Sequence, residues 1–270
     1  MKVFIATAKK DIFARKWSLI TYCIIGLGLA WLYIAIFPTF SKESAKFNEL
    51  LATYPKSILE AFNISQLKMD TLQGFMSAEH FSLVWPAMAI LLAISTAGQS
   101  LSGEIESGTM ALLLSLPVSR LKLFWSKYMA GMIVILLFTM ITIFPIVPLA
   151  HWYGVSFTAN NVWLISILSF CFAWAIYSLT FLFSAIFSER SHTYFVAGGI
   201  VLLMYVVKIM SGMIHSFEKL KYASAFYYYQ ADKTFVKGSL DIQDILVFCG
   251  VAVIATAIAL IVFLRRDVSV

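Results

Sequence analysis

Charge is scarce in this sequence. Only 13% of its 270 residues are Asp, Glu, Lys or Arg, and 61% are hydrophobic, whereas about a quarter of the residues in a soluble domain are charged. The mean hydropathy is +0.86. So few charges cannot cover a soluble surface, and the sequence therefore predicts an integral protein of the lipid bilayer. The net charge of +6 does not indicate a nucleic-acid partner, because the basic residues form no patch interleaved with polar surface.

Motifs for chemistry are absent as well. The sequence contains no G-x-x-x-x-G-K-[ST] loop to hold ATP phosphates and no H-E-x-x-H zinc motif. Cys23, Cys171 and Cys249 lie in apolar runs without metal-ligand spacing, so we expect them to pack as small hydrophobic residues. The four histidines are isolated near the ends of apolar runs. We therefore expect a chain that is not an enzyme and has no catalytic, metal or cofactor site of its own.

What the sequence does contain is six long apolar runs. They cover residues 17–37, 81–101, 123–150, 162–187, 194–213 and 245–264. A helix needs roughly 20 residues to cross a bilayer, so we expect an all-α, polytopic fold in which residues 17–270 form one domain with six transmembrane helices. Pro38 should end the first helix, and Pro145 and Pro148 should kink the outer end of the third. No Asp or Glu falls inside these six runs.

Three other segments are not apolar enough to cross the membrane. Residues 39–80 are amphipathic and predict two short helices outside the membrane. Residues 215–244 are polar and aromatic, which suits the headgroup boundary. Residues 1–16 carry lysines at a spacing of seven, with apolar residues on another face. Two interpretations of residues 1–16 stay open, an amphipathic helix on the cytoplasmic leaflet and a simple basic flank of the first helix.

The basic residues also predict the orientation. Short loops rich in Lys and Arg stay on the cytoplasmic side. The short flanks at residues 1–16, 120–127 and 265–266 are all basic, and most of the remaining lysines fall in the two long segments, where charge counts less. We therefore expect both termini and the 102–122 loop in the cytoplasm.

The 102–122 loop is the stretch that least resembles membrane. Its acidic start is followed by Gly108 as a pivot, and residues 110–116 predict two helical turns that Pro117 cannot continue. Ser119 suits the N-cap of the next helix, which Arg120, Lys122 and Lys127 enter from the aqueous side. The apolar side of the two turns is too short to span a bilayer, so it should lie against the membrane surface or another protein.

The same loop carries a resemblance to a known family. The pattern Glu104-x-Glu106-x-Gly108-Thr109, then Leu112-Leu113, then Leu116-Pro117-Val118-Ser119-Arg120 resembles the coupling-helix loop of ABC-2-type transporter permeases. These are the membrane subunits of one class of ATP-driven exporters, and their six-helix plan would cover nearly the whole chain. The resemblance implies that the ATPase-coupling residues are Glu104, Glu106, Gly108, Thr109, Leu112, Leu113, Leu116, Pro117, Ser119 and Arg120.

The resemblance implies partners that the chain itself does not contain. Two permease subunits, identical or different, would pair in the cell membrane, most simply a bacterial plasma membrane. Each would lay its coupling helix in a groove of a separate cytosolic ATPase that binds ATP and Mg²⁺. The cargo would be hydrophobic or amphipathic, such as a drug, an antimicrobial peptide or a lipid-like molecule. Residues 215–244 would form short re-entrant or outer helices.

Two features inside the apolar runs remain ambiguous. Lys208 lies about 14 residues into the fifth run, where an ionisable residue suggests a role in the pathway, although its stem is long enough to snorkel to the outer interface. We favour snorkelling slightly. Ala89, Ala93 and Ala97 recur every four residues in the second run. They would allow close helix packing, or they reflect only how common alanine is in membrane helices.

Two functions of other classes compete with the exporter subunit. A self-contained secondary transporter or channel normally needs several intramembrane acids and broken helices in repeated halves, and the runs contain no acid. An intramembrane enzyme would need paired catalytic residues at membrane depth, and the sequence has none there.

Overall fold

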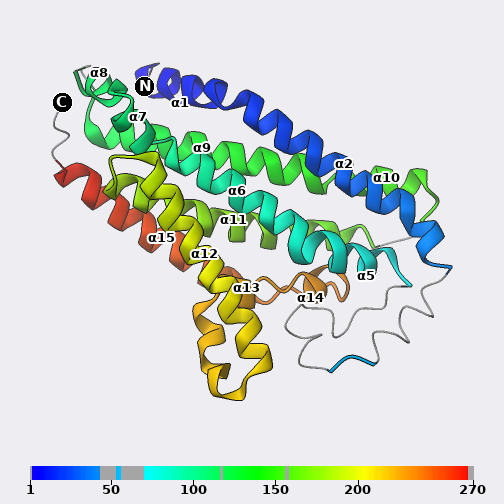
Figure 1. Cartoon of the computed structure of the whole chain (residues 1–270). Coiled ribbons are helices and arrows are strands. Elements are labelled where there is room, and N and C mark those ends of the chain that lie inside the picture. The colour runs from blue at the N-terminus through cyan, green and yellow to red at the C-terminus, as the bar shows by residue number, and fades with distance from the viewer. Residues whose placement is uncertain (1, 43–52, 56–69, 116–117, 156–157, 267–270) are drawn as a thin grey trace.

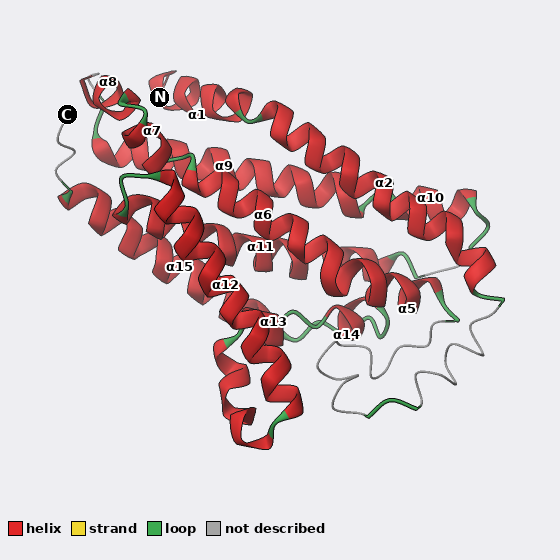
Figure 2. Cartoon of the chain, in the orientation of Figure 1, coloured by secondary structure: helices red, strands yellow, loops and turns green. Residues whose placement is uncertain are grey.

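The computed structural model describes residues 2–42, 53–55, 70–115, 118–155 and 158–266. This part of the chain is all-helical and contains no strand (Figure 2). Six helical segments are long and apolar enough to cross a membrane, which confirms the predicted fold class. They are α2 (Lys16–Phe40), α5, η1 and α6 together (Leu72–Gly98), α9 and α10 together (Arg120–Trp152), α11 (Asn160–Ile186), α12 (Arg190–Met213) and α15 (Ile242–Arg265).

Several of the shorter helices lie toward the two ends of this bundle. Figure 1 shows α1, α7 and α8 at the end where α15 finishes, and α5, α10 and α14 toward the other end. We call the first of these the α7–α8 end. The remaining helix bounds, including those within the composite crossing segments, are α1 (Lys2–Ala14), α5 (Leu72–Met76), the π-helix η1 (Ser77–Val84), α6 (Trp85–Gly98), α7 (Ser102–Glu106), α8 (Thr109–Ser115), α9 (Arg120–Ile143), α10 (Ile146–Trp152), the 3₁₀-helix η2 (His215–Ala223), α13 (Ala225–Tyr228) and α14 (Ala231–Phe235).

The second crossing segment begins earlier than predicted. It starts at Leu72 instead of residue 81, so residues 72–80 of the predicted outer segment 39–80 are continuous with the second crossing segment. Thr71 caps this start, because its side chain accepts a hydrogen bond from the Gly74 N–H at 3.1 Å. Residues 43–52 and 56–69, where the outer helices were expected, lie outside the described residues.

Proline acts differently in the first and third crossing segments. Pro38 does not end the first helix as expected, since α2 continues to Phe40; a proline this near a helix end removes few hydrogen bonds. In the third segment the α-helix stops at Ile143 and a new one starts at Ile146, after Pro145. The outer end of the third segment is therefore broken where a kink was predicted.

Two acidic residues lie in the crossing segments because these helices begin earlier than the predicted apolar runs. Glu79 lies in η1 and Asp244 lies in the first turn of α15, although neither falls in a predicted apolar run. Both are at the end of the bundle away from α7 and α8. Arg190 similarly starts α12 four residues before the predicted run, because the polar residues of a first helical turn do not register as apolar sequence.

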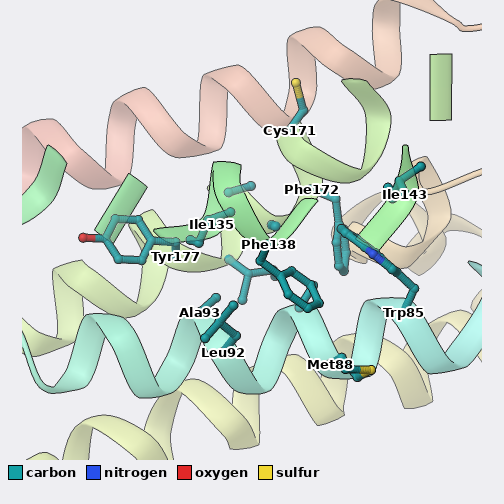
Figure 3. Packing of buried hydrophobic residues seen from close by; sticks show 14 of the residues in the cluster. Trp85, Met88, Leu92, Ala93, Ile135, Phe138, Ile143, Cys171, Phe172 and Tyr177 are labelled. Atoms are coloured by element: carbon teal, nitrogen blue, oxygen red, sulfur yellow. The ribbon is translucent and has the colours of Figure 1, made fainter. Parts of the chain in front are cut away.

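The core is formed where α6, α9 and α11 meet (Figure 3). Trp85 stacks on Phe138 with ring centroids 5.6 Å apart, and its indole N–H donates to Thr142 Oγ1 at 2.9 Å. A Cβ on Gly131 would lie 2.3 Å from the Tyr177 hydroxyl, so glycine is required for this approach of α11 to α9. In α6 the alanines at every fourth position, Ala89, Ala93 and Ala97, are all buried.

Candidate functional site

The candidate site is the segment between the second and third crossing segments. It contains the predicted turns as α8 and, before them, a second short helix, α7, that the sequence did not indicate. Gly108 joins the two with a φ of 71°, a backbone conformation that favours glycine. Ser119 caps α9, since its hydroxyl accepts a hydrogen bond from the Lys122 N–H at 3.4 Å. Leu116 and Pro117 lie outside the described residues.

Hydroxyl groups fix the start of α7 to two other helices. The Ser184 Oγ of α11 accepts hydrogen bonds from the Leu101 and Ser102 N–H groups at 3.2 and 3.0 Å. From α12, the Thr193 hydroxyl donates to Ser102 Oγ at 3.0 Å. All three hydroxyl-bearing side chains are fully buried. The start of α7 is therefore fixed to α11 and α12.

Glu106 ties α7 to the start of α12. One of its oxygens, Oε2, accepts hydrogen bonds from the Arg190 backbone N–H at 2.8 Å and from Arg190 Nε at 2.9 Å. An acid at this point satisfies a free N–H at the helix N-terminus and complements the helix dipole. The hydrogen bonds from Arg190 hold the pKa of Glu106 below its ordinary value. Glu106 is thus a contact between elements of this chain.

Glu104 belongs to a buried charge cluster. The Lys127 ammonium, which is 0% exposed, lies 2.9 Å from Glu104 Oε1 and 3.2 Å from Asp11 Oδ2. Thr109 Oγ1 donates a short hydrogen bond to the other oxygen of Glu104. One lysine of α9 therefore joins α1, α7 and, through Thr109, the first residue of α8. We call Asp11, Glu104, Thr109 and Lys127 the Lys127 cluster.

The charges of the Lys127 cluster are held in place by one another. Burial by itself raises the pKa of Glu104, but the Lys127 charge and the hydrogen bonds from Thr109 and Lys127 outweigh burial, and the pKa lies below its ordinary value of 4.5. An ion pair removed from water is costly unless its geometry is good, and removing one partner is strongly destabilising. The expectation that Lys127 enters from the aqueous side is wrong, because its side chain is fully buried.

The N-terminal residues form a separate helix, α1, that ends at Ala14 and packs along α9. Its buried face carries the charged residue Asp11. Arg15, which follows α1, is also buried, and its guanidinium donates to Ser100 Oγ at 2.9 Å. Phe13 and Trp17 point outward instead, 58% and 70% exposed. Phe13 of α1 and Trp17 of α2 are thus open to a membrane surface, while Asp11 and Arg15 face the bundle.

The leucines of α8 differ in how exposed they are, and this difference decides which of them can contact a partner. Met110 is buried and Leu113 is partly buried against the core, whereas Leu112 is 70% exposed. From the sequence alone, apolar residues of a helix that pack on the same chain look the same as apolar residues that bind another protein. Leu112 is therefore the better candidate for a partner contact. Arg120, at the end of the segment, donates to the Arg266 carbonyl at 2.6 Å and so joins α9 to the end of α15.

Lys208 lies far along α12 from the candidate site. Its side chain is partly buried, and Asp232 of α14 is near enough to act on it electrostatically. This arrangement does not separate a snorkelling lysine from a pathway lysine, and both predictions stand. Among the described residues no group of three or more His, Cys, Asp or Glu side chains is placed to hold a metal ion.

Sequence reasoning missed the residues that hold the site. Asp11, Arg15, Ser184 and Arg190 were not singled out, because their partners lie about 80 to 120 residues away and no local pattern links them. Lys127 did carry a signal, since it falls inside the predicted 123–150 run, where a charge needs a partner. Asp11 is similarly the one acid among the first 16 residues.

Comparison with protein families accounts for nearly the entire chain. The model of the family described as ABC-2 family transporter protein matches residues 10–268. Comparison with curated proteins gave no match. The matched region contains all six crossing segments and the whole α7–α8 segment. The chain therefore belongs to the ABC-2 family of transporter proteins.

Proposed function

We propose that the chain is the permease subunit of an ABC-2-type ATP-driven exporter. A separate cytosolic ATPase would dock on α7 and α8, hydrolyse ATP with Mg²⁺, and drive the movement of the crossing helices. The permease would carry out no chemistry itself. One observation supports this proposal best. Leu112 is exposed on α8, while the α7 segment before it is held by hydrogen bonds and ion pairs to α9, α11 and α12, and through Lys127 to α1.

This combination suits the transmission of force. A docking surface on a loose loop would move without moving the membrane helices. Here a displacement of α8 acts through Thr109 and Glu104 on Lys127 in α9, and a displacement of α7 acts through Glu106 on Arg190 in α12. Coupling between distant sites is carried by such packed and hydrogen-bonded contacts. In this proposal Glu104 and Glu106 are positioning residues, and Leu112 makes the partner contact.

A second permease subunit, identical or different, would complete the translocation path. The helices α2 and α12 support this proposal, because they leave much of their apolar surface uncovered; Phe195 is 82% exposed and Leu203 is 64% exposed. Exposed apolar surface in a membrane faces either lipid or another helix. Export of a hydrophobic or amphipathic cargo fits helices with so little charge along their length.

The docking proposal is tested by Leu112→Asp. Burial of a leucine contributes about 1.5–3 kcal/mol, so we expect the variant to weaken ATPase binding by roughly tenfold or more. Ile242→Asp is the matched control, since Ile242 is 76% exposed at the other end of the bundle. The measurements are recovery of the ATPase with the solubilised chain and ATP hydrolysis coupled to transport in liposomes.

The two variants separate the exporter from its main rival. The exporter account expects Leu112→Asp to lower ATPase recovery and coupled hydrolysis while Ile242→Asp leaves ATPase recovery unchanged. If Leu112→Asp keeps wild-type levels of both, α8 is not the coupling element. A self-contained secondary transporter would then be the better proposal.

A further inference from the structure

A groove of about 250 Å³ lies on the outer surface of the bundle between α9, α11 and α15. It is lined by Trp125 of α9, Trp174 of α11, and Val253 and Leu260 of α15. Trp125 and Val253 are 38% and 58% exposed, so the groove opens outward. It is separate from the Lys127 cluster and from α2 and α12, where we place the path for the cargo.

Three polar side chains in this groove, Tyr128, Trp174 and Thr256, are already hydrogen-bonded. The Tyr128 hydroxyl lies 2.7 Å from Trp174 Nε1, 2.8 Å from Ser178 Oγ and 2.9 Å from Thr256 Oγ1. A hydroxyl with three neighbours at hydrogen-bond distance has no capacity left for a ligand. The remaining lining is aliphatic and aromatic. The groove therefore suits a purely apolar occupant, such as a hydrocarbon chain.

The depth of the groove matches one leaflet of a bilayer. Trp125 is five residues from the start of α9, and Leu260 is five residues from the end of α15, which places both about 7.5 Å below the helix ends at 1.5 Å per residue. Val253 lies about 18 Å below the end of α15 by the same measure. The hydrocarbon of one leaflet is about 15 Å thick, so the groove runs along the acyl chains at the α7–α8 end.

Two cations lie closer than the groove residues to the helix ends at the α7–α8 end, because Lys122 precedes Trp125 by three residues in α9 and Arg265 follows Leu260 by five residues in α15. Lys122 and Arg265 are exposed, and in the described part of the chain neither forms an ion pair. The neighbouring Arg266 is engaged with the Ala185 carbonyl at 2.8 Å. Lysine and arginine at this level attract anionic headgroups. We propose that the groove binds one anionic phospholipid, with an acyl chain between Trp125 and Leu260 and the phosphate beside Lys122 and Arg265.

The first test uses lipid recovered with the wild-type chain. Protein extracted in mild detergent from membranes containing phosphatidylglycerol and phosphatidylcholine should retain phosphatidylglycerol at least threefold above its membrane fraction. Ala257→Phe fills the groove and should remove most of this lipid. Ile254→Phe is the matched control, because Ile254 is 62% exposed on the same helix and does not line the groove. Full retention by Ala257→Phe would overturn the site.

The second test measures contact in the bilayer. Brominated lipids quench the fluorescence of tryptophans that they contact. The test uses a version in which the other exposed tryptophans, Trp17, Trp31, Trp152 and Trp163, are replaced by phenylalanine, so that Trp125 and Trp174 report on the groove. In liposomes, brominated phosphatidylglycerol should quench the chain at least threefold more than brominated phosphatidylcholine at the same mole fraction. Lys122→Gln with Arg265→Gln should abolish the difference, while Lys9→Gln with Lys16→Gln should keep it. Equal quenching by the two lipids would overturn the headgroup site. No quenching of these tryptophans would mean that another protein covers the groove, and would overturn the lipid site.

These tests need no ATPase. The lipid proposal rests only on the embedding of the six helices in a membrane. Its failure would leave the coupling proposal untouched, and a failure of ATPase docking would leave the lipid site untouched.

Discussion

Lys127 places a full charge inside the bundle, where an unpaired charge would be very costly. Asp11 and Glu104 offset that cost, and each comes from a different helix. The pairing makes the position of α1 and of α7 depend on a single side chain of α9. A movement of α1 or α7 away from α9 would leave the buried Lys127 with fewer partners for its charge.

Replacement of Lys127 by Met should therefore destabilise the protein. The variant leaves Asp11 and Glu104 buried without their cation, and breaking a buried pair in this way costs about 3–5 kcal/mol. Glu104 is partly open to water, so we expect the lower end of this range. The thermal midpoint in detergent measures the effect. Lys9→Met, which removes an exposed lysine of α1, should change it little; equal midpoints for the two variants would show that the Lys127 cluster contributes nothing.

The pKa of Glu104 predicts a pH dependence. A carboxyl whose folded-state pKa lies below its ordinary value of 4.5 contributes stability that is complete above that value and is lost as the pH falls through the folded-state pKa. Wild-type protein should thus be more stable than Glu104→Gln at about pH 6.5, and the difference in stability between the two proteins should become smaller below about pH 4. The thermal midpoints of both proteins at the two pH values measure this difference. An unchanged difference would mean that Glu104 is not ionised in its pair.

At the scale of a residue, the sequence predicts what is local. Ser119 was recognised as an N-cap because its partner, Lys122, is three residues away. Gly108 was predicted as a pivot because it stands between the acidic start of the loop and the predicted turns at residues 110–116. The partners of Glu104 and Glu106 could not be predicted, since Lys127 pairs across two helices and Arg190 is 84 residues from Glu106.

At the scale of an element, Gly108 sets the angle between α7 and α8. With φ at 71° and open space around its Cα, only the backbone conformation restricts substitution there. Gly108→Ala should cost about 1–2 kcal/mol, because a side chain disfavours the left-handed region, and Gly108→Val should cost more. Gly108→Asn is the control that should be nearly tolerated, since asparagine adopts this region readily.

The measurement for Gly108 is again the thermal midpoint, with ATPase recovery as a second readout. The expected order of destabilisation is Val, then Ala, then Asn. If Asn and Val behave alike, the left-handed conformation is not what position 108 requires.

The π-helix η1 contains three of the four buried side-chain polar atoms that have no hydrogen-bond partner in the described chain; the fourth is Arg15 Nη1. Ser77 Oγ and both ring nitrogens of His80 are buried without a hydrogen-bond partner there. The His80 ring lies among aromatic rings, and its centroid is 5.7 Å from that of Tyr33 and 5.1 Å from that of Phe81. A buried polar group without a partner costs about 1–3 kcal/mol, and π-helical turns are frequent at functional sites.

His80→Phe should therefore raise stability by about 1 kcal/mol, because an aromatic ring of similar shape needs no partner. The readout is the thermal midpoint, with Phe81→Leu as a control that should lower it. Lower stability of His80→Phe would show that His80 has a partner, such as a bound water. If transport falls while stability rises, His80 has a role in the cargo path.

Elements differ in how far the sequence predicted them. The six crossing segments follow from apolar runs, because a bilayer imposes a minimum length on each. The early start at Leu72 was missed because residues 72–80 mix Glu79, His80 and Ser77 with apolar residues, and burial of that mixture depends on neighbours that the sequence does not specify. The outward position of Leu112 depended likewise on how α8 rests on the bundle.

At the scale of the whole molecule, six crossings would place both termini on one side of the membrane, and the basic flanks predict that this side is the cytoplasm. Single cysteines at Ser107 and Ser191, in a version without Cys23, Cys171 and Cys249, should resist an impermeant thiol reagent in intact cells. A cysteine at Ser239, at the other end, should react. Labelling at position 107 from outside would reverse the topology and exclude a cytosolic partner on α7 and α8.

The central proposal is that an ATPase rests on α8 at Leu112, and a photo-cross-linking amino acid placed at that position tests it most directly. Irradiation of intact cells should join the chain covalently to an ATPase subunit, and the same amino acid at Ile242 should not. Identification of the product by mass spectrometry as the chain plus an ATP-binding-cassette subunit is the result that the account predicts. An ATPase that is captured only from position 242, or one that co-purifies with the chain but never cross-links from position 112, would contradict it.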